Sequence, residues 1–242
     1  MKQDTKKHLR ILLYGPGGSG KSSFIHSVDS VCQNRITCPA DACSSGHTVT
    51  VTVLFLAYKT YQIEKEVEGQ YYPFVFNVMG LESKGGVCEE DIKHAMQGHL
   101  KEGYKTPDIN DKADILVCVV RADTFMSRGD TLAKMNRITA AARDYGIPQM
   151  AILTHIDEAC PLVKESIKNV YKSNHIKMKS FQMEHLHNEL GIRLTNIFPV
   201  KNYHEEMDLN GDIDMVILRA LRQIIQIAKD QVKRAQKVGM GG

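Results

Sequence analysis

The stretch RILLYGPGGSGKSSFIHSV, residues 10–28, places a strand-length apolar run directly before a cluster of glycines and then a helical pattern. Within it, GPGGSGKS at residues 15–22 matches G-x-x-x-x-G-K-[ST] in the required position, after a strand and before a helix. A loop that wraps a phosphate turns its backbone N–H groups inward, and side chains would block that approach. The sequence therefore predicts a phosphate-binding loop in preference to a glycine-rich turn without a ligand.

The residues of this loop have separate expected roles. The glycines relieve crowding around the backbone amides, and the positive end of the following helix adds to the attraction for phosphate. Lys21 is expected to reach the β and γ phosphates, and the hydroxyl of Ser22 to ligate Mg²⁺. The predicted nucleotide-binding residues of this segment are Gly15, Gly17, Gly18, Ser19, Gly20, Lys21, Ser22 and Ser23.

Strand-length apolar runs recur along the chain with helical segments between them. Their alternation predicts a doubly wound, mostly parallel sheet with helices on both faces. The second run begins with a strict Thr/Val alternation, which predicts a half-exposed edge strand antiparallel to the third run. The length of 242 residues favours a single domain over residues 1–242. The runs are residues 10–14, 48–58, 71–79, 113–120, 149–154 and 196–200.

Two helices have clear boundary signals. Residues 127–146 read as a helix that Gly146 closes. The last helix is expected to begin at Asp212 as its N-cap, and its apolar stripe predicts a helix that packs on the core.

Composition excludes several classes of protein. The formal charge of +3 is spread along the chain, which disfavours a nucleic-acid partner. The first ten residues are polar, and no run reaches the roughly 18 apolar residues of a membrane helix. We therefore expect neither secretion nor a membrane partner, and we interpret the six cysteines as reduced thiols.

The segment THID at residues 154–157 indicates which base the loop accompanies. It follows the fifth apolar run, where guanine-nucleotide proteins carry N/T-K-x-D, so Thr154, His155 and Asp157 are predicted base-site residues. A carboxylate accepts hydrogen bonds from N1–H and N2–H₂ of guanine, whereas N1 of adenine is itself an acceptor. His155 replaces the usual lysine and would stack on the base. The alternative for Asp157 is a helix cap.

After the sixth run, PVKNY at residues 199–203 occupies the place of a loop that contacts the base carbonyl. Lys201 and Asn202 are the candidates there.

With the phosphate loop, THID and VKNY in this order, the chain resembles the interferon-induced protein 44 and 44-like family of GTPase-like proteins. YYPFVFNVMGLESKGGVCEEDI (71–92) resembles the family segment P-F-I-x-x-D-x-x-G-L, and VKNYHEEMDLNGDIDMVILRAL (200–221) resembles its closing segment. The resemblance covers nearly the whole chain. It implies a guanine-nucleotide-binding P-loop fold, cytoplasmic residence and a role in interferon-linked antiviral or antiproliferative responses.

Two departures from ordinary GTPases lead us to expect slow hydrolysis. The aspartate of D-x-x-G is Asn77, a weaker partner than a carboxylate for the hydration shell of Mg²⁺. Leu81 follows Gly80, where many GTPases place the glutamine that orients the attacking water. No catalytic residue is assigned, and Thr48 is a candidate second Mg²⁺ ligand.

Three functions remain open from the sequence. The first is a guanine-nucleotide-binding protein that uses GTP or GDP and Mg²⁺, with slow or partner-assisted hydrolysis. The second is a catalytically inactive nucleotide-binding scaffold, which Asn77 and Leu81 favour. The third is an ATPase or small-molecule kinase, which would need an acidic strand end or an arginine-rich lid. The expected partners are guanine nucleotide and a protein partner or a nucleotide-dependent homodimer.

Overall fold

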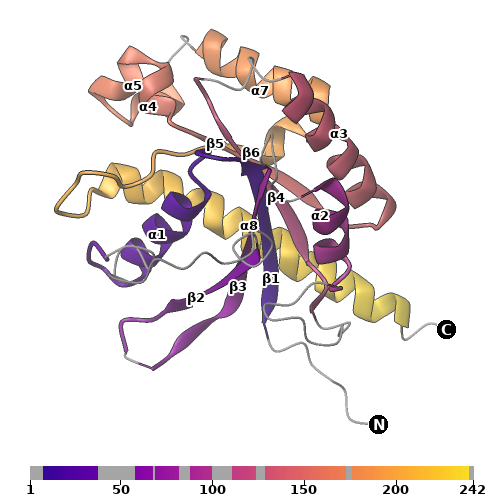
Figure 1. Ribbon diagram of the computed structural model, residues 1–242. Helices are drawn as coiled ribbons and strands as arrows, with labels where there is room; N and C mark the ends of the chain where they lie inside the picture. The colour runs from indigo at the N-terminus through magenta and orange to yellow at the C-terminus, as the bar shows by residue number, and fades with distance from the viewer. Residues whose placement is uncertain are drawn as a thin grey trace, which may run out of the picture.

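A computed structural model describes residues 8–37, 58–67, 69–81, 88–99, 111–123, 129–172 and 176–239. Their six strands form one sheet in the order β2-β3-β1-β4-β5-β6 (Figure 1). β2 pairs with β3 in the antiparallel sense, and all other pairs are parallel. This confirms the predicted GTPase-like, doubly wound α/β fold with one antiparallel edge strand. The strands are β1 (Leu9–Pro16), β2 (Tyr58–Glu64), β3 (Tyr71–Leu81), β4 (Ile115–Arg121), β5 (Gln149–Thr154) and β6 (Ile197–Pro199).

Helices cover both faces of this sheet (Figure 1). On one face, α1 (Lys21–Cys32) and α8 (Gly211–Gly239) pack their apolar side chains against the strands. The opposite face carries α2 (Glu89–Met96), α3 (Gly129–Asp144) and the described end of α7 (Ile176–Leu190). Among the described residues, no helix is long and apolar enough to cross a membrane. The short elements are α4 (Ile156–Ala159), α5 (Pro161–Glu165), α6 (Asn169–Lys172) and a 3-10 turn at Leu194–Asn196.

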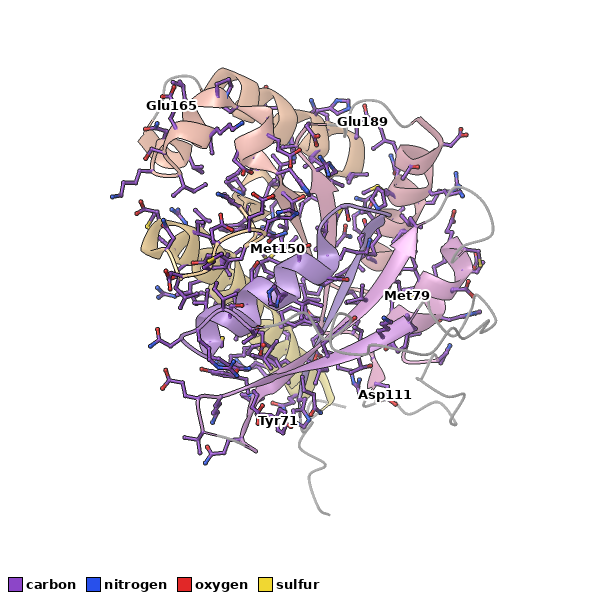
Figure 2. All side chains as sticks on the ribbon, turned by 60° about the vertical axis from the view of Figure 1, so that its left-hand side comes forward. Tyr71, Met79, Asp111, Met150, Glu165 and Glu189 are labelled. Carbon is purple, nitrogen blue, oxygen red and sulfur yellow. The ribbon has the colours of Figure 1, made fainter. Side chains whose placement is uncertain are left out.

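The alternation of side chains along the strands divides the core into two layers. On β1, Ile11 and Leu13 face α1 and α8, whereas Leu12 and Tyr14 face the other helices. Figure 2 shows Met150 of β5 in the interior, where its side chain is fully buried. Tyr71 lies at the distal tip of the β2–β3 hairpin and is half exposed (Figure 2). The period of two along each strand thus fills both layers from the same sheet.

The carboxyl ends of the five parallel strands meet at one edge of the sheet. β1 lies between β3 and β4, so the chain leaves β1 toward one side for β3 and later continues on the other side with β4. Open α/β sheets bind ligands outside such a switch point. The loop after β1 therefore opens into the ligand-binding edge of this fold class.

The edge strand is shifted along the chain from its predicted place. Residues 48–57 of the predicted strand lie outside the described residues, and the strand that pairs with β3 is Tyr58–Glu64. Its antiparallel pairing is as predicted. Ile63 is the one side chain of β2 that is fully buried. One face of an edge strand is partly in solvent, so few of its residues are apolar and its pattern in the sequence is weak.

The start of α8 corrects a second prediction. The helix begins at Gly211, and Oδ1 of Asn210 accepts hydrogen bonds from the backbone N–H of Asp212 (3.0 Å) and Ile213 (3.4 Å). Asn210 is therefore the N-cap, and the assignment of Asp212 was wrong. The physical reason is tertiary, because the hydroxyl of Tyr203 accepts the N–H of Asn210 at 2.7 Å and fixes it there.

The predicted helix over residues 127–146 corresponds to α3, which ends at Asp144. Gly146 follows in the left-handed region with φ of 65°, so its closing role is confirmed.

Candidate functional site

The loop after β1 has a backbone that only glycine allows at two positions. A β-carbon at Gly15 would lie 2.1 Å from the carbonyl oxygen of Val119 on β4. Gly20 has φ of 85°, and a β-carbon there would lie 3.0 Å from Nδ2 of Asn202. The loop therefore packs closely against the ends of the neighbouring strands, and a side chain at either position would prevent that packing.

Lys21 is folded over this loop. Its Nζ donates hydrogen bonds to the carbonyl oxygens of Gly15 (2.9 Å) and Pro16 (2.8 Å), and the residue is only 9% exposed. The cation is thus held within reach of any anion that enters the loop.

The first turn of α1 also presents groups for an anion. Gly20 has no side chain with which to cap the helix, so the backbone N–H groups of the first turn have no side-chain acceptor there. Ser22 and Ser23 are exposed on this turn. Together these features give the positive end of α1 an open approach.

Side-chain hydrogen bonds tie the ends of β5 and β6 to the phosphate loop. Oγ1 of Thr154, at the end of β5, lies 2.8 Å from the carbonyl oxygen of Ser19. Nδ2 of Asn202, just after β6, donates to the carbonyl oxygen of Gly20 at 3.1 Å. Segments that are about 135 and 182 residues apart in the chain therefore meet at one loop.

His155 has one consistent hydrogen-bonding arrangement. Oγ1 of Thr154 donates its single hydrogen to a backbone carbonyl, so it accepts from Nδ1 of His155 at 2.9 Å. Nε2 of His155 then accepts from Nη1 of Arg121 at 3.1 Å. Burial, and next the charge of Arg121, lower the pKa of His155. The ring is therefore neutral at pH 7 and has a fixed orientation.

Arg121 is a site residue that the sequence reasoning missed. Its guanidinium binds Asp123 through Nε (2.9 Å) and Nη2 (2.8 Å), and Nη2 also binds Glu158 at 2.8 Å. Asp123 and Glu158 therefore fix the guanidinium of Arg121, which donates a hydrogen bond to His155. The signal for Arg121 was its position, because it directly follows the apolar run 113–120 and so lies at the carboxyl end of a parallel strand.

A pocket of about 420 Å³ opens beside these residues. Asp157 lies in the first turn of α4 and is 26% exposed, whereas His155 occupies the N-cap position. The helix-cap alternative therefore does not describe Asp157, whose carboxylate faces the pocket. The pocket is lined by Ser23, Arg121, His155, Asp157, Glu158, Lys201, Asn202, Tyr203, His204, Glu205 and Glu206.

Asn77, which occupies the position of the D-x-x-G aspartate, is hydrogen-bonded to the neighbouring strand. Asn77 is 2% exposed, and its Nδ2 donates to Oγ1 of Thr60 on β2 at 2.8 Å. Thr48 lies outside the described residues. Within the ranges that the structure describes, no group of three or more His, Cys, Asp or Glu residues is placed to hold a metal ion.

The predicted site residues other than Thr48 all lie in described segments at the carboxyl edge. Thr154 and Asn202 contact the phosphate loop, while Asp157 and Lys201 line the pocket beside it.

Known proteins resemble the chain over nearly its whole length. Interferon-induced protein 44 of Mus musculus is 30% identical over 94% of this chain and 56% of its own length. The Homo sapiens protein of the same name is 29% identical over 93% of this chain and 53% of its own length. Interferon-induced protein 44-like of Homo sapiens is 28% identical over 94% and 53%. The chain is a homologue of these proteins. The family resemblance predicted from the motifs is thereby confirmed.

These matches cover only part of each relative. The chain spans about half the length of the curated relatives it matches. No protein-family model matches it. Among solved structures, a probable GTP-binding protein engB aligns with a TM-score of 0.49 and 15% identity, over 91% of this chain and 99% of that chain.

A pH dependence follows from the surroundings of His155. An unfolded histidine binds a proton near pH 6.5, but the folded state binds it at lower pH because the pKa is lowered. The unfolded state therefore takes up protons first, and stability is lost as pH falls below about 6.5.

Urea unfolding tests this prediction. The free energy of unfolding should differ less between pH 7.5 and pH 5.5 for His155→Gln than for the wild type. His204→Gln, whose side chain is 84% exposed, is the control. Equal pH dependence in wild type and His155→Gln would contradict this prediction.

Proposed function

We propose that this chain, as a single domain, is a guanine-nucleotide-binding protein with slow or partner-assisted GTP hydrolysis. The observation that carries the proposal is the joining of the base-side loops to the phosphate loop. Thr154 and Asn202 are hydrogen-bonded to Ser19 and Gly20, and the pocket that contains Asp157 lies directly beside them. A phosphate tail and a base could thus be bound by one continuous edge of the sheet.

The base side favours guanine. The carboxylate of Asp157 only accepts hydrogen bonds, and guanine offers N1–H and N2–H₂ as donors. Adenine has an acceptor at N1 and would leave the carboxylate without a partner. The neutral, oriented ring of His155 offers a flat surface on which the base would stack.

Ser22 is the described residue that fits a magnesium ion. Its exposed hydroxyl lies on the first turn of α1, beside Lys21. Mg²⁺ commonly takes one or two protein ligands and completes its shell with waters and phosphate oxygens, so this donor set suffices. When bound, the ion would neutralise charge on the β and γ phosphates. We propose Thr48 as its second protein ligand.

Slow hydrolysis follows from two side chains at the end of β3. Leu81 is 3% exposed and packs in the core beside α2 and α3, so it cannot orient a water. The amide of Asn77 is engaged by Thr60 and carries no charge. The same hydrogen bond favours the second candidate function, a nucleotide-binding scaffold without catalysis.

The relatives extend the proposal to a biological setting. Their names describe proteins induced by interferon. We propose an interferon-linked, cytoplasmic role in immune responses, exerted through a protein partner or a nucleotide-dependent homodimer.

Nucleotide identity tests the proposal most directly. The purified protein is denatured, the released nucleotide is identified by chromatography, and the emptied protein is titrated with GDP, GTP, ADP and ATP. We expect guanine nucleotides to bind about tenfold or more tightly than adenine nucleotides, since an unpaired buried acceptor costs about 1–3 kcal/mol. Equal affinities, or a preference for adenine, would sink the assignment. Single-turnover hydrolysis of GTP separates a slow enzyme from a scaffold.

A further inference from the structure

Lys201 lines the pocket and lies between two carboxylates. Its Nζ is 2.8 Å from Oε1 of Glu206 and 3.9 Å from Oδ2 of Asp157. All three side chains are about a quarter exposed, with values of 26–27%. The cation is therefore paired with Glu206 and only approaches Asp157.

The backbone of its own loop holds Glu206 in place. Oε2 accepts hydrogen bonds from the N–H of His204 at 2.9 Å and of Glu205 at 3.2 Å, which leaves Oε1 for Lys201. Burial alone would raise the pKa of Glu206, but the N–H of His204 and the ammonium group of Lys201 outweigh it and lower the pKa to about 2. The carboxylate is thus ionised near neutral pH, and the two backbone N–H groups fix its orientation.

Two other acidic side chains of the pocket, Glu158 and Glu205, make no ion pair with Lys201. Glu158 binds Arg121 at 2.8 Å, and Glu205 is 89% exposed beside His204. Asp157 is the carboxylate that faces Lys201 at the longer distance. Glu206 therefore has no acidic competitor for Lys201 at short range among the described pocket residues.

We propose that Glu206 is a specificity-determining positioning residue that holds Lys201 away from Asp157, so that Asp157 keeps its acceptor oxygens for the donors of a guanine base. This inference rests on the proposed guanine site and assigns a role to a residue that does not itself touch the base.

The physical argument is a competition between two ion pairs. Without a charge at residue 206, the nearest carboxylate to Nζ of Lys201 is that of Asp157, and Coulomb attraction rises as the gap closes. A lysine hydrogen-bonded to Asp157 occupies an acceptor that guanine needs and offsets the negative charge that attracts its N–H groups. Guanine would then have to displace the lysine. Adenine nucleotides, which make no such contact, would not be weakened.

A double-mutant cycle on the full chain tests this role. Glu206→Gln keeps the length of the side chain, and its carbonyl oxygen can still accept the two backbone N–H groups, so the loop retains its contacts. GDP and ADP affinities are measured by calorimetry for the wild type, Glu206→Gln, Lys201→Met and the double variant. Glu165→Gln is the control, because it removes an exposed carboxylate that does not line the pocket.

We expect Glu206→Gln to weaken GDP binding about two- to fivefold, the upper part of the range for a partly exposed ion pair, and not to weaken ADP binding. In the Lys201→Met background, the same change should have no effect, because no cation remains to close on Asp157. Glu165→Gln should match the wild type.

An equal loss of GDP affinity in both backgrounds would overturn the inference and show that Glu206 acts by shaping its loop. So would a parallel loss of ADP affinity. If the wild type showed no preference for GDP over ADP, the proposed guanine site would be wrong, and the role of Glu206 would be wrong with it. If the wild type preferred GDP but Glu206→Gln behaved as described above, only the role of Glu206 would be wrong.

Discussion

Lys21→Ala is expected to weaken GDP binding by about 10- to 150-fold, because a hydrogen bond to a charged partner contributes about 1.5–3 kcal/mol. Nζ of Lys21 lies 2.8–2.9 Å from the carbonyl oxygens of Gly15 and Pro16, and the residue as a whole is 9% exposed. The ammonium group is therefore already held at the loop, and a phosphate needs only a small reorientation of the side chain to bind it. Charge-assisted hydrogen bonds of this kind are stronger than neutral ones.

Isothermal titration with GDP measures the loss, and Lys229→Ala on the exposed face of α8 is the matched control. Circular dichroism and thermal unfolding of the nucleotide-free proteins report on the fold. We expect both variants to fold and only Lys21→Ala to lose affinity. Wild-type affinity in folded Lys21→Ala would show that the loop does not bind phosphate through this residue.

The second large effect is expected for Asp157→Ala, which should remove most of the preference for guanine over adenine nucleotides. Loss of the acceptor for two base donors costs about 1–3 kcal/mol, or about 5- to 150-fold in affinity. ADP affinity should not fall, because adenine has no donor at N1 for this carboxylate, and removal of an unpaired acceptor can only favour adenine. Competition titrations of GDP and ADP against a labelled nucleotide give both values in one experiment.

Glu158→Ala provides the comparison for Asp157→Ala. Glu158 follows Asp157 directly and lines the same pocket, but its carboxylate is bound to Arg121 at 2.8 Å. Its removal should leave the selectivity between guanine and adenine intact. Unchanged selectivity in Asp157→Ala, or an equal loss in Glu158→Ala, would contradict the assignment of Asp157 as the base reader.

Local patterns predicted the sheet well where its strands are buried. The runs 10–14, 71–79 and 149–154 became β1, β3 and β5, because strands covered on both faces read as continuous apolar segments. The edge strand was harder to place, since β2 has polar residues at most positions and Ile63 as its fully buried side chain. Its pairing with β3 depends on a partner that is distant in sequence, and propensity does not encode that partner.

The caps show the same division. Gly146 closes α3 because its own backbone conformation suits that position, and the sequence predicted it. Asn210 caps α8 because the hydroxyl of Tyr203 accepts its N–H, which no local pattern contains. Asp212 has the right chemistry for a cap but lies inside the first turn.

The sequence by itself predicted the glycine-rich loop after β1, the buried strands, and the candidate site residues Thr154, His155, Asp157, Lys201 and Asn202 near the strand ends. Glycine spacing and apolar runs are local properties, so they can be recognised without the fold. The tertiary structure decided which of these residues meet. Only folding brings Arg121 to His155 and Thr60 to Asn77, because these side chains lie on different strands and loops. Glu206 and Lys201 share the loop after β6, and the folded conformation of that loop pairs them. Parallel strands gather their carboxyl ends at one edge, but the hydrogen bonds across that edge depend on distances that sequence spacing does not fix.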